Sequence, residues 1–524
     1  MISRRLDRFV RSTAALVVIV IALTGVDVQP ARADSYIAIT GTGSTWSQNA
    51  LDQWRKNVAA NYGMTVNYSG VGSSAGRRDF ISGSVDFAVS EIPFQSAPED
   101  GSPPETPSIG YAYMPIVAGG TSFMYNLKIG GRRVTNLRLS GETITKIFTG
   151  GITNWNDPAI KADNPGLAMP DKAIVPVVRS DGSGSTAQFT LWMSKQFSSI
   201  WGAFCGCSGL TSQYPAFGNS KAQNGSLGVA GYVSQDYGEG AITYVEYSYA
   251  IKSGFPVAKV LNSAGYYVEP TAPSVAVALL QAQINTDSGS ADYLTQILDG
   301  VYNNSDPRTY PLSSYSYMIV PTEVGGIFTT DKGNTLGAFA RYMLCEGQQQ
   351  ATALGYSPLP LNLVLAGSDQ IARIPGAGNT GIDVNACNNP TFKAGDSPGN
   401  NLLAQTAPQP AACDKKGPNQ CTTGTAGAVA DTPVSGTGSG GSASGTTSGT
   451  TAGSAQYDEN GALIGGATGA GNAVSSPFTL PADSIGAPQW VMLGAAALLV
   501  LAILLPPLFS RRLKRSGGSP PPST

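Results

Sequence analysis

The sequence predicts an α/β protein in which strands and helices alternate and the sheets are mostly parallel. The first observation behind this prediction is a set of short runs rich in β-branched and aromatic residues, each followed by a turn. The second is helical periodicity: Trp46, Ala50, Trp54 and Val58 recur every four residues on one apolar face, and Gly63 can end that helix. Strands are expected at 65–68, 85–89, 174–178 and 241–245, and helices at 75–81, from 187 to about 197, at 275–284 and at 336–354. Repeated strand, turn and helix are typical of α/β folds.

Three of the turns that lead into helices combine glycine with hydroxyl side chains. These turns are 41–46 (GTGSTW), 70–76 (GVGSSAG) and 181–186 (DGSGST). Free N–H groups and the dipole at a helix N-terminus favour an anion, and glycine lets the backbone approach it closely. Arg179 precedes the third turn and can offer two parallel N–H groups to an oxyanion. One such turn alone is usually only a helix cap, but three of them beside an arginine predict a small-anion site at the carboxyl ends of the strands.

The composition excludes several kinds of chemistry. The 524 residues include no histidine, so neither a Ser-His-Asp or Cys-His nucleophile system nor a histidine-ligated metal site can be built. The segment between the two basic ends carries an excess of about nine acidic side chains, which argues against a nucleic-acid partner. None of the three turns has the lysine of a nucleotide-binding P-loop. We therefore expect no cofactor and no metal, and an anion that is bound by local geometry rather than by a broad positive field.

The two ends of the chain predict export and membrane anchoring. In residues 1–33, four arginines precede an apolar run and an Ala-Arg-Ala site, which is typical of a signal peptide; an uncleaved anchor is the alternative. Residues 489–509 are uncharged and long enough to span a bilayer, and the basic tail at 510–524 indicates a cytoplasmic end. Residues 422–488 begin with a tract of Thr, Gly, Ser and Ala and are expected to form a disordered, flexible stalk. A single C-terminal transmembrane helix is therefore predicted to hold the protein at the cell surface, with a cleaved sorting tail as the alternative.

Six cysteines in an exported chain predict three disulfide bonds. They are Cys205, Cys207, Cys345, Cys387, Cys413 and Cys421, and they allow fifteen pairings. A bond between Cys413 and Cys421 would close a short loop. A zinc site is the less favoured alternative because only one residue separates Cys205 from Cys207. Residues 366–421 hold three of the six and form an appendix, to which the sequence assigns no role.

Five segments together resemble the phosphate-binding proteins of bacterial phosphate ABC transporters. They are 41–46, 67–74 (NYSGVGSS), 85–91 (VDFAVSE), 177–185 (VVRSDGSGS) and 244–250 (YVEYSYA), and their order and spacing match that family across about 36–360. The resemblance implies a two-lobed, type II periplasmic-binding-protein fold at 34–365 that closes on one phosphate. It places lobe 1 at about 34–121 and 250–365, and lobe 2 at about 122–249.

The resemblance also implies which residues contact phosphate. The family's contacts would fall on Thr45, Trp46 (through its backbone N–H), Ser73, Arg179, Ser183, Gly184 and Ser185, with Asp181 orienting the guanidinium. The family places one carboxylate, usually an aspartate, after the strand at 85–89, and here that position is Glu91. Phosphate near neutral pH carries a proton that sulfate lacks, so such an acceptor favours phosphate over sulfate. Glu91 must bend back to reach the same oxygen; the alternative is a solvated acid on the lobe surface.

These inferences predict an extracellular solute-binding protein, not an enzyme, that captures inorganic phosphate between two lobes and can deliver it to an ABC permease. The C-terminal tether departs from the family, whose members are commonly free or lipid-anchored. One alternative is a surface-tethered adhesion or scaffold protein on the same fold with a degenerate site, which the intact Arg179 turn opposes. The other is a hydrolase with Ser183 or Ser44 as nucleophile, which the lack of a lysine in these turns opposes.

Overall fold

The computed structural model describes residues 36–98, 101–287, 289–290, 292–378, 381–428, 456–457 and 463–464. The predicted signal peptide at 1–33, the predicted span at 489–509 and the tail at 510–524 lie outside these residues, as does most of the predicted stalk. In the described part of the chain, no helix combines the length and the hydropathy of a membrane span.

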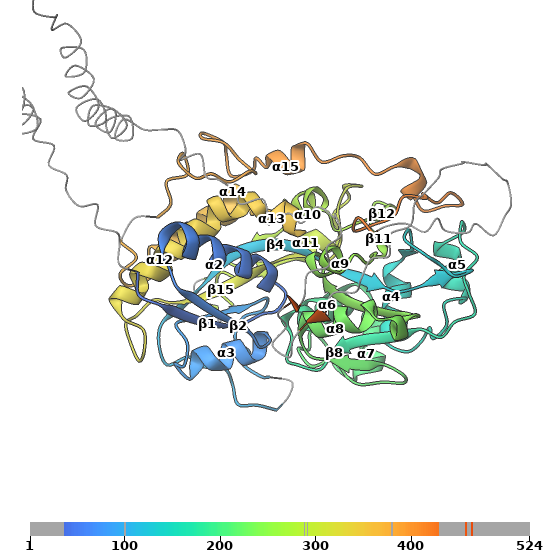
Figure 1. The fold of residues 1–524 in the computed structure, drawn as a ribbon, viewed down its shortest axis with the longest axis horizontal. Helices are drawn as coiled ribbons and strands as arrows, with labels where there is room; N and C mark the ends of the chain where they lie inside the picture. Colours follow the sequence, from blue (N-terminus) through green and yellow to red (C-terminus); the bar gives the residue numbers. More distant parts are fainter. Residues whose placement is uncertain are drawn as a thin grey trace, which may run out of the picture. The chain divides into compact units, whose positions relative to one another are not determined.

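A mixed eight-stranded sheet forms the centre of the fold (Figure 1), in the order β2-β1-β3-β15-β4-β10-β8-β9. Its strands are β1 (Ile39–Gly43), β2 (Val66–Gly70), β3 (Phe87–Ser90), β4 (Tyr111–Tyr125), β8 (Val175–Arg179), β9 (Lys221–Gln223), β10 (Ala241–Glu246) and β15 (Ser313–Pro321). The pairs at both ends of the sheet are parallel, as the strand–helix alternation predicted. At the centre, β15 runs antiparallel to β3 and β4, and β10 runs antiparallel to β4.

The long strand β4 is shared by two halves of the molecule. It pairs with β15 up to Gly120 and with β10 from Thr121 onward. We call the part built on β1, β2, β3 and β15 lobe 1, and the part built on β8, β9 and β10 lobe 2. The sequence placed the return to lobe 1 near residue 250. Instead, β11 (Lys259–Leu261) pairs with β7 (Arg138–Leu139), so residues 257–268 lie with lobe 2.

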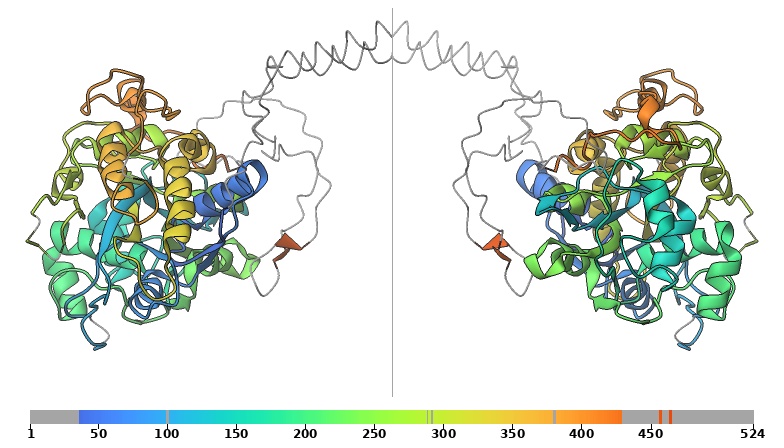
Figure 2. Two further views of the ribbon diagram at one scale, coloured as in Figure 1. Left: turned by 90° about the vertical axis from the view of Figure 1, so that its left-hand side faces the viewer. Right: turned by 90° about the vertical axis from the view of Figure 1, so that its right-hand side faces the viewer.

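Helices cover both faces of lobe 1, as Figures 1 and 2 show for α2, α3 and α12. Helix α2 (Gln48–Tyr62) buries Ala50, Trp54 and Val58, as its periodicity predicted, and ends at Gly63, whose φ of 66° is in the left-handed region. The other helices that bear on the site are α3 (Ser73–Ile81), α6 (Gly184–Gln196), α8 (Gly225–Ser234) and α9 (Tyr247–Ser253). The remaining short elements of the domain are α4 (Gly141–Phe148), α5 (Pro158–Asp163), α7 (Ser198–Cys205), α11 (Asp299–Tyr302), β5 (Lys128–Ile129), β6 (Arg132–Arg133) and β12 (Tyr267–Val268). A separate pair, β16 (Gln456–Tyr457) and β17 (Leu463–Ile464), is antiparallel.

Two predicted helices differ from the structure. The helix expected at 275–284 is α10 (Ala272–Leu279), and β13 (Gln283–Ile284) then pairs with β14 (Gln296–Ile297). The helix expected at 336–354 is α12 (Thr330–Leu344), followed by a 3-10 turn and α13 (Ala351–Leu354). The interruption falls at Cys345, which is disulfide-bonded to Cys387 and leaves the helical conformation.

The predicted appendix packs on the domain. The three disulfide bonds join Cys205 to Cys207, Cys345 to Cys387 and Cys413 to Cys421, so the predicted number and the short 413–421 loop are confirmed. Helix α14 (Leu361–Ile371) is largely buried. We call residues 381–428, which contain α15 (Leu402–Gln405), the strap. Figure 1 shows the strap passing over α14 and α10 and on toward β11 and β12.

The packed chain extends past the expected start of the stalk at residue 422. Thr425 is buried, and its hydroxyl donates to the Val257 carbonyl at 2.6 Å. The Thr425 N–H donates to the carbonyl of Thr135 at 3.0 Å. The low-complexity composition hid these contacts, because backbone groups and one hydroxyl make them rather than apolar side chains.

Candidate functional site

Four helix N-termini, two from each lobe, meet at one place. Helices α2 and α3 belong to lobe 1, and α6 and α8 belong to lobe 2. The Ser74 N–H, in the first turn of α3, donates to the Gly182 carbonyl of lobe 2 at 3.0 Å. The Ser226 N–H, in the first turn of α8, donates to Thr45 Oγ1 of lobe 1 at 3.0 Å. The structure therefore brings together the three turns that the sequence singled out and adds a fourth.

Arg179 lies at the end of β8 and faces this junction from lobe 2. Its Nε donates to Asp181 Oδ1 at 2.7 Å, a second N–H bonds the other Asp181 oxygen, and Nη1 donates to Ser226 Oγ at 3.4 Å. Burial raises the pKa of Asp181 and the guanidinium lowers it, and the net pKa lies below the ordinary value. Asp181 also accepts from the Gly225 N–H at 2.9 Å. A guanidinium has five N–H donors, so Arg179 keeps donors beyond those used by Asp181 and Ser226.

Glu91 directly follows β3 and supplies the carboxylate of the site. It is 1% exposed, so the alternative of a solvated surface acid is wrong. Oε1 accepts from the hydroxyls of Ser44 at 2.5 Å and Ser316 at 2.8 Å, and Oε2 accepts from Ser73 at 2.8 Å. Hydroxyls of lobe 1 thus hold the carboxylate at the surface where lobe 1 meets lobe 2.

The start of α6 faces Glu91 from lobe 2. A Cβ atom on Gly184 would lie 2.1 Å from Glu91 Oε2, so any larger residue there would have to displace the carboxylate. Ser183 caps the helix: its Oγ accepts from the Thr186 N–H at 3.1 Å, and its own N–H donates to Ser212 O at 2.9 Å. The Ser185 hydroxyl is buried and has no hydrogen-bond partner among the described residues. Buried polar groups nearly always have partners, so Ser185 is a donor suited to a ligand.

The turn at 44–46 contributes less directly than the sequence implied. The Trp46 N–H, expected to face the anion, donates to Ser44 Oγ at 2.9 Å. The Trp46 indole is buried and its Nε1 donates to Thr121 Oγ1 at 3.3 Å. Thr45 Oγ1 lies 2.9 Å from Ser226 Oγ, which links the lobes.

Three residues of this junction, Ser44, Ser226 and Ser316, were not among the predicted ligands. Ser226 follows Asn224 and Gly225, so it repeats the pattern of a glycine and a hydroxyl at a helix start. This pattern is visible in the sequence and could have identified Ser226. Ser44 lies inside the turn at 41–46, but the sequence indicated it only as a possible nucleophile. Ser316 sits in the middle of buried β15, where a single serine carries no pattern of its own.

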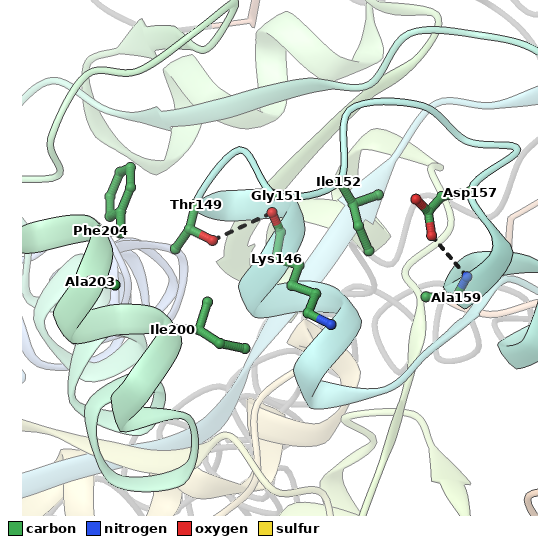
Figure 3. Close-up of a pocket in the computed structure, with 9 residues that line it drawn as sticks. All are labelled: Lys146, Thr149, Gly151, Ile152, Asp157, Ala159, Ile200, Ala203 and Phe204. Carbon is green, nitrogen blue, oxygen red and sulfur yellow. Dashed lines mark hydrogen bonds between the residues drawn. The ribbon is translucent and has the colours of Figure 1, made fainter.

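A surface pocket of about 680 Å³ lies elsewhere on lobe 2 (Figure 3). Its lining comes from α4, α5, α7 and neighbouring residues and contains none of the predicted site residues: Lys146, Thr149, Gly151, Ile152, Asp157, Ala159, Ile200, Ala203 and Phe204. Its charged groups are already paired, because Lys146 bonds Glu142 at 2.6 Å and Asp157 accepts from the Ala159 N–H at 2.8 Å. Within the described ranges, no cluster of three or more potential metal ligands occurs.

Comparison with known proteins agrees with this geometry. A family model described as the PBP superfamily domain matches residues 28–346. The phosphate-binding protein PstS of Xylella fastidiosa strain Temecula1 is 32% identical over 330 residues, which are 63% of this chain and 83% of that protein. The chain belongs to the PstS family within the PBP superfamily. The resemblance stated from the motifs is confirmed.

Other matches extend the comparison. The phosphate-binding protein PstS 2 of Mycobacterium tuberculosis strain H37Rv is 30% identical over 335 residues, covering 61% of this chain and 82% of that protein. The solved structure of a high-affinity periplasmic phosphate-binding protein (PfluDING) bound with phosphate has a TM-score of 0.50 and 19% identity. The aligned region covers 68% of this chain and 100% of that protein's chain. At that identity the likeness supports the fold alone, an α/β fold of the type II periplasmic-binding-protein kind. The curated relatives are named as binding proteins, in agreement with the prediction that the chain is not an enzyme.

Proposed function

We propose that this chain binds inorganic phosphate between lobe 1 and lobe 2 and supplies it to an ABC-type phosphate permease. The observation that carries the proposal is the junction itself: a buried guanidinium, four helix N-termini and a buried carboxylate, in a member of the PstS family. Such an arrangement replaces the water around a tetrahedral oxyanion with hydrogen-bond donors and leaves one acceptor for its proton.

The residues proposed to contact phosphate divide by role. The donors are Arg179, the N–H groups of Ser73, Gly184 and Ser185, and the hydroxyls of Thr45, Ser183 and Ser185, with Asp181 orienting the guanidinium. The Ser73 hydroxyl donates to Glu91 Oε2 instead. Ser226 joins Arg179 to Thr45 and is added as a positioning residue. Glu91 is the proposed acceptor. Sulfate has no proton to give, so it would leave two acceptors facing each other, at a cost of about 1–3 kcal/mol or more.

The proposed location is the outer face of the membrane. The signal peptide at 1–33 would be removed, and the uncharged stretch at 489–509 would anchor the chain by its C-terminus, with the stalk between anchor and domain. Removal of residues 489–524 should release the protein into the medium, and a truncated protein that stays with the membranes would contradict the anchor. The adhesion alternative has no support from the relatives, which are named for phosphate binding.

The proposal is tested by calorimetric titration of the protein after removal of bound phosphate by partial unfolding and dialysis. We expect saturable binding of one phosphate per chain and much weaker binding of sulfate. The absence of heat with phosphate, from protein whose circular dichroism shows it folded, would overturn the proposed function.

A further inference from the structure

The position of the Glu91 carboxylate depends on two hydroxyls that are not proposed ligands. Ser44 and Ser316 both donate to Oε1, at 2.5 and 2.8 Å. Ser316 is fully buried in β15, a central strand, and Ser44 is 1% exposed directly after β1. Both donors therefore sit on rigid parts of lobe 1 and fix one oxygen of the carboxylate.

The other oxygen faces lobe 2. Among the described residues, Oε2 accepts only from Ser73, at 2.8 Å, and it lies against Gly184 at the start of α6. A carboxylate offers about four acceptor positions. With three filled by serines, about one is left, and it belongs to the oxygen that faces the helix N-terminus of lobe 2.

We propose that Ser44 and Ser316 are positioning residues that set the selectivity of the site between protonated and unprotonated oxyanions; this rests on the proposed function. By holding Oε1, they turn Glu91 so that a single acceptor position meets the anion, which then must donate a proton there. Without them the longer glutamate side chain can rotate, and either oxygen, or neither, faces the ligand. Selectivity then falls although the donors that bind any tetrahedral anion remain.

The test compares Ser316→Ala, Ser44→Ala and the conservative Ser316→Thr in competition titrations of phosphate against sulfate at one pH. We expect each alanine variant to lower the ratio of phosphate to sulfate affinity by about tenfold, the value of one lost hydrogen bond to a charged group, and Ser316→Thr to restore most of it. Ser313→Ala is the matched control, because Ser313 is buried on the same strand and donates to Tyr310 O at 2.7 Å instead.

An unchanged ratio in Ser316→Ala and Ser44→Ala, or an equal fall in Ser313→Ala, would overturn the inference. Failure of the proposed function is a different result, since the parent protein would then bind no phosphate at all. The thermal unfolding midpoint of each variant separates a loss of selectivity from a loss of fold.

A second, independent observation concerns the strap at 381–428, which is attached to both lobes. On lobe 1, Cys387 is disulfide-bonded to Cys345, and Asn389 Nδ2 donates to Leu344 O at 3.2 Å. Further along, Ala404 and Ala407 are buried against α10, and Arg308 Nη1 donates to both of their carbonyls, at 3.0 and 3.3 Å. The first part of the strap is thus held by a covalent bond and a small apolar contact.

The last part of the strap is held by lobe 2. Arg138, which is 1% exposed, donates to the carbonyls of Cys413 at 3.0 Å and Asn419 at 2.8 Å. Lys259 pairs with Asp414 through two contacts of 2.9 Å. The 413–421 disulfide closes the loop that carries these groups. Between the two anchored parts, Pro408, Gln409, Ala411 and Ala412 are exposed.

We infer that the strap is a splint that favours the closed arrangement of the lobes. The two lobes already touch at the site, through Ser74 and Gly182, while every strap contact is made. Figure 1 shows the strap on the opposite side of β4 from α3, α6 and α8. A hinge rotation that opens the site changes the distance between the two anchors, so opening must bend the strap or break its contacts. A state that is already closed binds its ligand more tightly and releases it more slowly.

The test is a full-length protein with a specific protease sequence inserted between Gln409 and Pro410, compared before and after cleavage. Cleavage should increase the radius of gyration of the phosphate-free protein in X-ray scattering and accelerate phosphate release several-fold. The control carries the same insertion between Gly130 and Gly131, an exposed turn within lobe 2. Unchanged scattering and release after cleavage at 409, or an equal change in the control, would overturn the splint. The scattering result stands even if the parent binds no phosphate.

Discussion

Gly184 lies so close to Glu91 that a Cβ atom on it would stand 2.1 Å from Oε2 and 2.7 Å from the Ser73 hydroxyl. The first residue of α6 in lobe 2 is thus fitted against a carboxylate of lobe 1. This contact is possible because the residue has no side chain, and it makes the closed site sensitive to a single methyl group.

Gly184→Ala should therefore weaken phosphate binding at least tenfold with little loss of thermal stability. Alanine is a better helix former than glycine, by about 1 kcal/mol in a helix interior, so α6 itself is not harmed. Gly231→Ala in α8 is the matched control, since a Cβ there meets no atom within 4 Å. Calorimetry measures the binding. Normal binding by Gly184→Ala would show that the lobes need not meet at Glu91.

Arg179→Ala should lower the affinity for phosphate 100-fold or more, because two hydrogen bonds to a charged ligand together contribute about 3 kcal/mol or more. It should also lower the unfolding midpoint, because buried Asp181 loses its partner. The double variant Arg179→Gln with Asp181→Asn should recover stability and still not bind. Arg132→Ala, at an exposed position of β6, controls for the loss of one positive charge. Binding by the double variant would remove Arg179 from the site.

Glu91→Gln should narrow the preference for phosphate over sulfate, because the amide can donate to an oxyanion that brings no proton. Glu91→Asp, which restores the family's usual residue, should keep the preference. Competition titration with both anions gives the ratio directly. Identical ratios in the parent and in Glu91→Gln would show that Glu91 is not the acceptor.

The site motifs could be predicted from sequence because each is local. Glycine and hydroxyl residues at 41–46, 70–76 and 181–186 lie where a strand ends and a helix begins, and the resemblance fixed their common ligand. The partners that complete the site could not be found in this way. Ser316 and Glu91 are 225 residues apart in the sequence. They are brought together only because β15 pairs with β3 in the sheet.

The fold was predictable to a similar depth. The sequence pattern located α2, α3 and the strands β2, β3, β8 and β10, but not the parallel strands β1 and β9. The antiparallel pairing of β4 is set by tertiary contacts that no short window contains. The strap was missed for another reason. Its contacts to Arg138 are made by backbone carbonyls of Cys413 and Asn419, which every residue type possesses.

Two of the disulfide bonds should differ in their effect on stability. Replacing Cys345 and Cys387 by serine should lower the free energy of unfolding by about 4 kcal/mol, because this bond closes a loop with a sequence separation of 42. The same change at Cys205 and Cys207, separated by 2, should cost under about 2 kcal/mol. Urea denaturation measures both. Equal losses would contradict the assignment of the 345–387 bond as a main tie of the C-terminal segment.

Glu246 gives a pH prediction. It ends β10 and accepts from the Ser248 N–H at 2.7 Å, and burial raises its pKa well above the ordinary value. The folded state therefore holds a proton that the unfolded chain releases above pH about 4.3, so Glu246 lowers stability as the pH rises past that point. Glu246→Gln has no charge to bury. The difference between its thermal unfolding midpoint and that of the parent should therefore shift in favour of the variant as the pH rises from 4 to 7. A difference that does not change with pH would contradict this.

The most direct test of the whole account is a crystal structure of the protein grown with phosphate. We expect one phosphate between the lobes, within hydrogen-bond distance of Arg179, the Ser185 hydroxyl and Glu91 Oε2. Phosphate bound elsewhere, for example in the pocket beside Lys146, with none of these three groups in contact with it, would contradict the central claim.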